Sequence, residues 1–213
     1  LSLPMVVSQG AFAVMVFTDR WFMSKIDAVH ITSAMGGGIA SFFCVSLFIG
    51  ILAYANALVA QYYGAGELRK CPRVVSQGLV MALLALPILA IATYFGGDVF
   101  AAMGHAEEQV ALEKTYFYVL MGGSFFTLSK CCIASYFAGI GRTRVVMICD
   151  VAGLLMNVPL SYVLIFGKLG MPALGIGGAA AGTVVALVFA NGLFFAFFLA
   201  REHRERFAVL DSF

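Results

Sequence analysis

Long apolar runs separated by short polar turns organise the sequence. A transmembrane helix needs about 20 mostly apolar residues, and six stretches of the 213-residue chain reach that length. They lie at residues 3–23, 31–63, 74–95, 110–140, 145–166 and 175–200. The second is long enough to tilt or to extend past the membrane. The pattern predicts an all-α integral membrane protein, with residues 1–213 forming a single bundle of six transmembrane helices.

The overall composition agrees with a membrane setting. Hydrophobic residues make up 62% of the chain and charged residues 11%, whereas soluble chains average about 45–50% and about 25%. The turns are too short to form a second domain, and the sequence contains no phosphate loop, HExxH, GxSxG or dinucleotide fingerprint. We therefore expect no enzyme and no cofactor. The five cysteines lie mostly in apolar runs, and we interpret them as free thiols.

Basic residues favour alternate ends of the helices. One set of ends holds Arg69, Lys70, Arg73, Arg142, Arg144, Arg201, Arg204 and Arg206. The other set holds Lys25, Lys114 and Lys168 with the acids Asp27, Asp98, Glu107, Glu108 and Glu113. Because cytoplasmic loops carry an excess of Lys and Arg, we predict a multi-pass protein of the cell membrane with both termini in the cytoplasm. The basic tail then serves as a membrane anchor, and no nucleic-acid partner is expected.

Four ionisable residues fall inside the apolar runs, namely Asp19, Arg20, Lys130 and Asp150. Each costs several kcal/mol at the bilayer centre unless it is paired or hydrated, which marks such residues as candidate pathway sites. Arg20 lies near a helix end and is expected to reach the interface. Lys130 and Asp150 flank one turn at similar depth, so we predict a buried charge pair whose role is either structural or functional.

Counting about 1.5 Å per residue along each helix places four polar side chains near one level. Asp19 lies about 22 Å from the basic end of its helix, Asn157 about 18 Å, Ser161 about 24 Å and Thr183 about 25 Å. These oxygen-bearing groups suit Na⁺ or a carboxyl that takes up a proton. Pro159 either bends its helix or frees a carbonyl as another ligand.

Four sequence stretches carry a family resemblance. They are VFTDRWFMSK, NALVAQYYGAGE, FAGIGRTRVVM and LLMNVPLSYVLIFGKLGMPALGIGGAAAGT. They resemble the N-terminal lobe of the multidrug and toxic compound extrusion (MATE) transporters. The resemblance implies one lobe of a twelve-helix transporter, whose two six-helix lobes face a central cavity in the lipid bilayer. It also implies export of organic cations or amphipathic drugs in exchange for H⁺ or Na⁺, with the C-terminal lobe as partner.

The resemblance assigns the cation site to Asp19, Asn157, Ser161 and Thr183. Ser161 stands where some members carry Asp, which weakens Na⁺ binding and favours proton coupling. Arg20 replaces a more usual small polar residue, and its positive charge would favour the ionised form of Asp19 if the two side chains lay close together. The second lobe is missing and the first residue is Leu1, so we expect a fragment, the alternative being that two copies pair.

Two other functions are considered. One is a lipid-linked oligosaccharide flippase of the same superfamily, which needs several basic cavity residues where this chain offers Arg20 and Lys130. The other is a non-transporting membrane subunit that uses the bundle to bind a partner. The three histidines lie in or beside turns and are expected at the surface; they are His30, His105 and His203.

Overall fold

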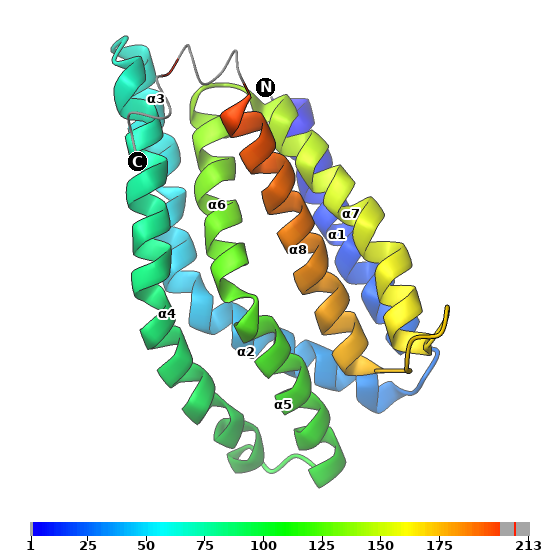
Figure 1. The fold of residues 1–213 in the computed structure, drawn as a ribbon. Coiled ribbons are helices and arrows are strands. Elements are labelled where there is room, and N and C mark those ends of the chain that lie inside the picture. Colours follow the sequence, from blue (N-terminus) through cyan, green and yellow to red (C-terminus); the bar gives the residue numbers. More distant parts are fainter. Residues whose placement is uncertain (1, 201–206, 208–213) are drawn as a thin grey trace.

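The computed structural model describes residues 2–200 and residue 207. These residues form α-helices and one 3-10 helix and contain no strand (Figure 1). The elements are α1 (Ser2–Met23), α2 (Ala28–Ala53), α3 (Ala55–Gly64), η1 (Leu68–Lys70), α4 (Cys71–Ala102), α5 (Glu107–Gly122), α6 (Ser124–Gly139), α7 (Thr143–Phe166) and α8 (Ile176–Leu199). Helix α7 packs against both α1 and α8, and α2 packs against α5. The chain is an all-α bundle.

Local chemistry explains where several helices begin and end. The Asp27 carboxylate accepts the backbone N–H of His30 at 2.8 Å and so caps the start of α2. Pro72 lies in the first turn of α4, where its missing N–H has no helical partner to lose. Helix α7 ends at Phe166 and is capped by Gly167, whose φ of 65° is a left-handed conformation that favours glycine.

The helix predicted over 110–140 is broken in the structure. Helices α5 and α6 meet at Gly123 with a bend of 49°. A Cβ built on Gly123 would lie 2.6 Å from Val184 Cγ2 of α8. The close approach of α8 therefore requires glycine at the bend. The predicted third helix also differs, because α4 extends beyond 74–95 at both ends, to Cys71 and Ala102.

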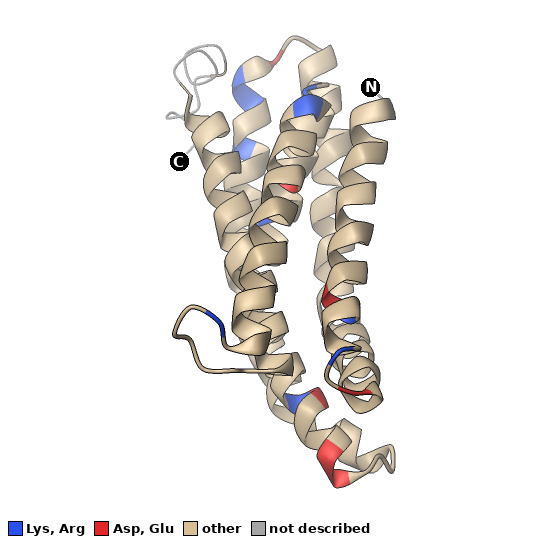
Figure 2. Cartoon of the chain, turned by 90° about the vertical axis from the view of Figure 1, so that its right-hand side faces the viewer, with Lys and Arg blue, Asp and Glu red and all other residues tan. Residues whose placement is uncertain are grey.

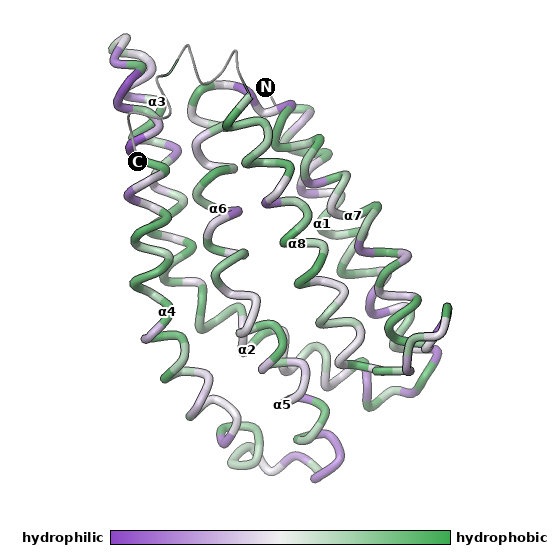
Figure 3. Tube along the Cα trace, viewed as in Figure 1, coloured by the Kyte–Doolittle hydropathy of each residue, from purple (hydrophilic) through white to green (hydrophobic). Residues whose placement is uncertain are grey.

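The described residues form six lengthwise helical segments, namely α1, α2–α3, α4, α5–α6, α7 and α8. Four segments of the described residues are long and apolar enough to span a membrane: Ala28–Gly64, Leu68–Ala102, Thr143–Phe166 and Ile176–Leu199. The bent pair α5–α6 makes a fifth. Helix α1, which contains Asp19 and Arg20, is not among the segments that pass this test. Apolar residues predominate in the middle of most of these segments, and polar residues are more frequent near their ends (Figure 3).

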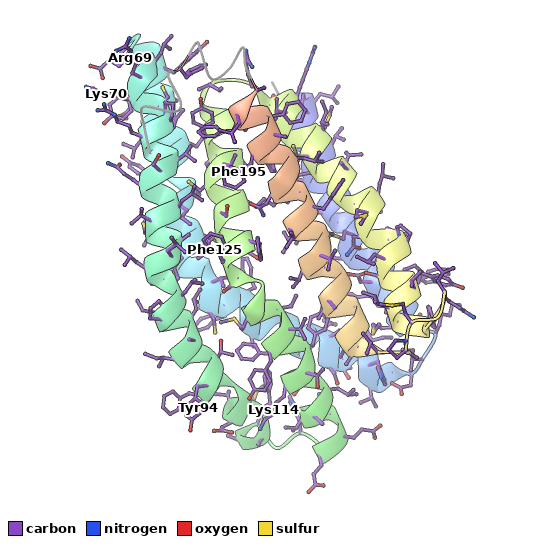
Figure 4. The ribbon with its side chains drawn as sticks, in the orientation of Figure 1. Arg69, Lys70, Tyr94, Lys114, Phe125 and Phe195 are labelled. Carbon is purple, nitrogen blue, oxygen red and sulfur yellow. The ribbon has the colours of Figure 1, made fainter. Side chains whose placement is uncertain are left out.

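Charged residues separate toward the two ends of the bundle (Figure 2). We call the end with the N-terminus and Arg69, Lys70, Arg73, Arg142 and Arg144 the basic end. We call the opposite end, with Asp27, Asp98, Glu107 and Glu108, the acidic end. Figure 4 labels Arg69 and Lys70 at the former and Lys114 at the latter. The basic residues 201, 204 and 206 lie outside the described residues, and the cytoplasmic location of the basic end stays a prediction.

Glycines bring α7 and α8 almost into backbone contact. A Cβ on Gly178 would lie 2.5 Å from the Leu164 carbonyl oxygen, and one on Gly182 would lie 2.6 Å from Ser161 Oγ. Small residues allow helix backbones to approach closely in membranes. This packing sets the distance between the polar side chains of α7 and those of α8.

Candidate functional site

Asp19 is the buried carboxylate near the acidic end of α1. Its side chain faces α7 and α8, and the residue is only 7% exposed. Thr183 of α8 donates its Oγ1 hydroxyl to Asp19 Oδ2 at 3.2 Å. The same hydroxyl lies 3.1 Å from the Ala179 carbonyl oxygen one turn earlier. Asp19 therefore links α1 to α8 through one long hydrogen bond.

Asn157 and Ser161 complete the group around Asp19. They are four residues apart on α7, so they share one face of that helix, and both are 0% exposed. Their side chains lie near the Asp19 carboxylate, but unlike Thr183 they make no direct hydrogen bond with it. The four residues predicted to share a level are thus brought together in the described structure; below they are called the Asp19 cluster.

The Asp19 cluster contains buried polar atoms whose hydrogen-bonding capacity is not met within the described residues. These atoms are Asp19 Oδ1, Asn157 Oδ1, Asn157 Nδ2 and Ser161 Oγ. Leaving a buried polar group without a partner costs about 1–3 kcal/mol. Three of the four atoms are oxygens, and two further oxygens come from Asp19 Oδ2 and Thr183. The donor set therefore fits a monovalent hard cation or a proton on the carboxylate.

Three further residues lie next to the Asp19 cluster in space or in sequence. Tyr116 of α5 is half-buried and lies close enough to Asp19 to interact with its charge; sequence reasoning did not single it out. Arg20 is exposed, beside Asp19 in sequence but on another face of α1. Pro159 lies on the exposed face of α7.

Lys130 and Asp150 form a second constellation, closer to the basic end. Lys130 Nζ of α6 lies 2.7 Å from Asp150 Oδ1 of α7, and the two side chains are 27% and 13% exposed. Ser8 of α1 donates its hydroxyl to Asp150 Oδ2. The structure therefore brings together the charge pair predicted from depth and joins it to α1.

A cavity of about 220 Å³ lies between α1, α6, α7 and α8. Ser8, Lys130 and Asp150 line it, and so does Thr183 of the Asp19 cluster. Phe12 and Leu154 contribute apolar wall. The two constellations thus border one continuous space.

A third polar group lies near the acidic end and was missed by sequence reasoning. Glu113 of α5 is 1% exposed. His105 Nδ1 lies 2.9 Å from Glu113 Oε2, and the Gln109 amide donates to Glu113 Oε1 at 3.0 Å. His105, expected at the surface, is partly buried: its side chain is 28% exposed and paired with the interior Glu113 carboxylate. His203 lies outside the described residues.

Gly36 explains how a carboxylate fits between α2 and α5. A Cβ at Gly36 would lie 2.5 Å from Glu113 Oε1. The i, i+4 spacing of Gln109 and Glu113 is the sequence signal that could have indicated this group.

Comparisons with known proteins agree with this architecture. The chain is 30% identical over 186 residues to a probable multidrug resistance protein NorM of Bradyrhizobium diazoefficiens, covering 87% of the chain and 40% of that relative. It is 29% identical over 192 residues to the multidrug resistance protein MdtK of Edwardsiella ictaluri, covering 89% and 41% respectively. The chain therefore spans less than half the length of these relatives.

A solved structure and a family model extend the comparison. The outward-facing structure of a multidrug resistance MATE family transporter of the MOP superfamily superimposes with a TM-score of 0.85 at 21% identity, covering 100% of this chain and 49% of that chain. At that identity the likeness concerns the fold, which is one half of the larger bundle. The family model MatE matches residues 4–163. The chain thus belongs to the MatE family of MATE transporters and corresponds to their N-terminal lobe.

Proposed function

We propose that the chain is the N-terminal half of a secondary antiporter that exports organic cations or amphipathic drugs in exchange for H⁺ or Na⁺. The observation that carries the proposal is the Asp19 cluster. It holds a buried carboxylate beside polar atoms that lack partners among the described residues. The relatives are named as multidrug resistance proteins, which supports the export of drugs.

The coupling step follows from the charge of the Asp19 cluster. Asp19 is the one carboxylate among its four residues, so the cluster carries one negative charge when empty and none when loaded with H⁺ or Na⁺. An uncompensated charge inside a membrane costs several kcal/mol. Moving a two-state equilibrium from 1:99 to 99:1 requires about 5.5 kcal/mol. Loading a single site is therefore of the right magnitude to drive a change of conformation.

Helix α1 is the element that this loading would move. Its Asp19 is joined to α8 through the 3.2 Å bond from Thr183, and Asn157 and Ser161 of α7 lie near the same carboxylate without a direct hydrogen bond to it. A cation bound to Asp19 would recruit the oxygens of Asn157 and Ser161 and draw α1 toward α7. Release of the cation would loosen that contact. The drug would then be bound or released as α1 shifts.

Dye export tests the proposal. The complete open reading frame that encodes the chain is expressed in bacteria lacking their own pumps, loaded with a fluorescent organic cation. We expect dye loss from cells with the wild type and at least tenfold slower loss with Asp19→Asn. Asp98→Asn is the matched control, because the Asp98 side chain is 82% exposed at the acidic end. Dye loss that is equal in both variants would contradict the proposal.

Changing the external Na⁺ concentration and pH in the same cells distinguishes the two ions. If H⁺ is the coupling ion, a pH gradient alone sustains export. If Na⁺ is the coupling ion, export requires external Na⁺. Wild-type protein that is present in the membrane but exports no dye under either gradient would refute cation-coupled export of this dye class.

A further inference from the structure

The Lys130–Asp150 pair lies inside the bundle and is not part of the Asp19 cluster. An ionisable side chain within a membrane helix is costly and commonly marks an ion pathway. The pair bridges α6 and α7, while Ser8 brings α1 to the same carboxylate. Three helices thus converge on Asp150, including the helix that carries Asp19.

The cavity joins this pair to the Asp19 cluster. Lys130 and Asp150 line one part of the wall, and Thr183, which donates to Asp19, lines another. Asp150 and Asn157 are seven residues apart on α7, a distance of about 10 Å along the helix axis. No other charged side chain is among the residues that line this cavity in the described structure.

The size of the cavity indicates what it holds. Drug-sized ligands occupy pockets of about 300–1,000 Å³, and this cavity measures about 220 Å³. A buried water needs only about 10–15 Å³ of such space together with polar partners. Ser8, Lys130, Asp150 and Thr183 provide those partners. Within the described half, the cavity is smaller than a drug-sized pocket and large enough for several waters.

Building on the proposed antiport function, we propose that this cavity is the hydrated path by which the coupling cation travels between Asp19 and the basic end. Asp150 is the intermediate carboxylate on the path, and Lys130 is a tethered cation that competes with the coupling cation for it. A cation arriving from Asp19 displaces the Lys130 ammonium from Asp150. When Lys130 returns to Asp150, the cation is released toward the basic end. Asp150 carries a cationic partner before and after the step. The displaced Lys130 ammonium, whose side chain is 27% exposed, is then stabilised by water in the cavity until the cation leaves and the pair re-forms.

Cysteine modification tests whether the cavity is hydrated, without requiring transport. Leu154 lines the cavity, and the adjacent Leu155 lies 69% exposed on the outside of α7. Leu154→Cys and Leu155→Cys are made in the full-length protein in lipid nanodiscs and treated with a small cationic methanethiosulfonate. Site-resolved mass spectrometry separates the new cysteine from the five native ones. Because the thiolate is the reactive form, we expect Leu154→Cys to react at least tenfold faster, and equal rates would overturn the hydrated path.

Charge removal tests the role of the pair. Lys130→Gln or Asp150→Asn alone leaves a partly buried charge without its partner, whereas the double variant removes both charges. We expect the double variant to reach wild-type abundance in the membrane and yet to show at least tenfold slower cation flux in proteoliposomes. A pair with only a structural role predicts wild-type flux in the double variant, and that result would overturn the proposal.

Failure of the path and failure of the proposed function give different results. If wild type and Asp19→Asn show equal cation flux, the antiport function itself is wrong, and the Leu154→Cys rate still reports hydration. If Asp19 is required but the double variant transports normally, the antiport function stands and the role of the pair is wrong.

Discussion

Gly182→Ala is the substitution whose effect follows most directly from the packing of the Asp19 cluster. The added Cβ would lie 2.6 Å from Ser161 Oγ, 3.1 Å from Ser161 Cα and 3.2 Å from Ser161 N. Ordinary Cβ contacts lie at 3.4–4 Å. Ser161 Oγ can rotate away, but the backbone of α7 cannot. Ser161 Cα must move from 3.1 Å to at least 3.4 Å from the new Cβ, a shift of about 0.3 Å. Such overpacking costs about 1–3 kcal/mol.

The same shift acts on the hydrogen bond next to Gly182. Thr183 Oγ1 donates to Asp19 Oδ2 at 3.2 Å, which is already long for an O–H···O bond. Displacing α8 by a few tenths of an ångström would weaken it further. We therefore expect Gly182→Ala to lower both the stability of the protein and the rate of cation-coupled export.

Gly192→Ala on the same helix is the matched control. A Cβ at Gly192 meets nothing within 4 Å, and replacing glycine by alanine in a helix gains about 1 kcal/mol. Because both variants share that gain, their difference isolates the clash and should be about 1–3 kcal/mol. Chemical or thermal unfolding of the two purified variants measures it. Equal stability and equal export would refute the packing account.

Three further predictions follow from individual contacts. Tyr116→Phe removes a hydroxyl near Asp19 and should change the pH or Na⁺ dependence of dye export while leaving protein abundance unchanged. An unaltered dependence would show that Tyr116 does not act on Asp19. Glu113→Gln disturbs two partly buried hydrogen bonds, to His105 and Gln109, and should lower the free energy of unfolding by about 1–3 kcal/mol. Denaturant titration measures this free energy, and an unchanged value would contradict the prediction. Hydrogen bonds from the His30 backbone and side chain lower the pKa of Asp27. The Asp27 cap of α2 is therefore fully stabilising at pH above the ordinary pKa of Asp, and it is lost as the pH falls through the lowered pKa. Hydrogen exchange at the start of α2 should show this acidic transition in the wild type and not in Asp27→Ala.

The helices could be predicted from the sequence because the bilayer sets their length and the apolar runs match it. The break at Gly123 was not predicted, because the run through residues 110–140 stays apolar on both sides of Gly122, Gly123 and Ser124. The contact that requires glycine at the bend is made by Val184 of α8, which is distant in sequence. Hydropathy alone does not reveal such a contact.

The Asp19 cluster was accessible to sequence reasoning because depth along a membrane helix can be counted from its end. Asp19, Asn157 and Thr183 lie on three different helices, yet a common level and the oxygen chemistry selected them. Tyr116 was not accessible by the same route, since an aromatic residue in an apolar run carries no distinctive signal. Glu113 was assigned to the acidic set of helix ends, because charge near a helix end usually reaches solvent.

Gradient-driven transport in proteoliposomes tests the central claim most directly. Purified full-length protein is reconstituted, and uptake of a fluorescent organic cation is followed under an imposed H⁺ or Na⁺ gradient and, separately, as exchange of substrate for substrate without a gradient. The account predicts that Asp19→Asn abolishes gradient-driven uptake and retains exchange, because the variant keeps the substrate path and loses the site of the coupling cation. Undiminished gradient-driven uptake by Asp19→Asn would contradict the assignment of Asp19 as the coupling carboxylate.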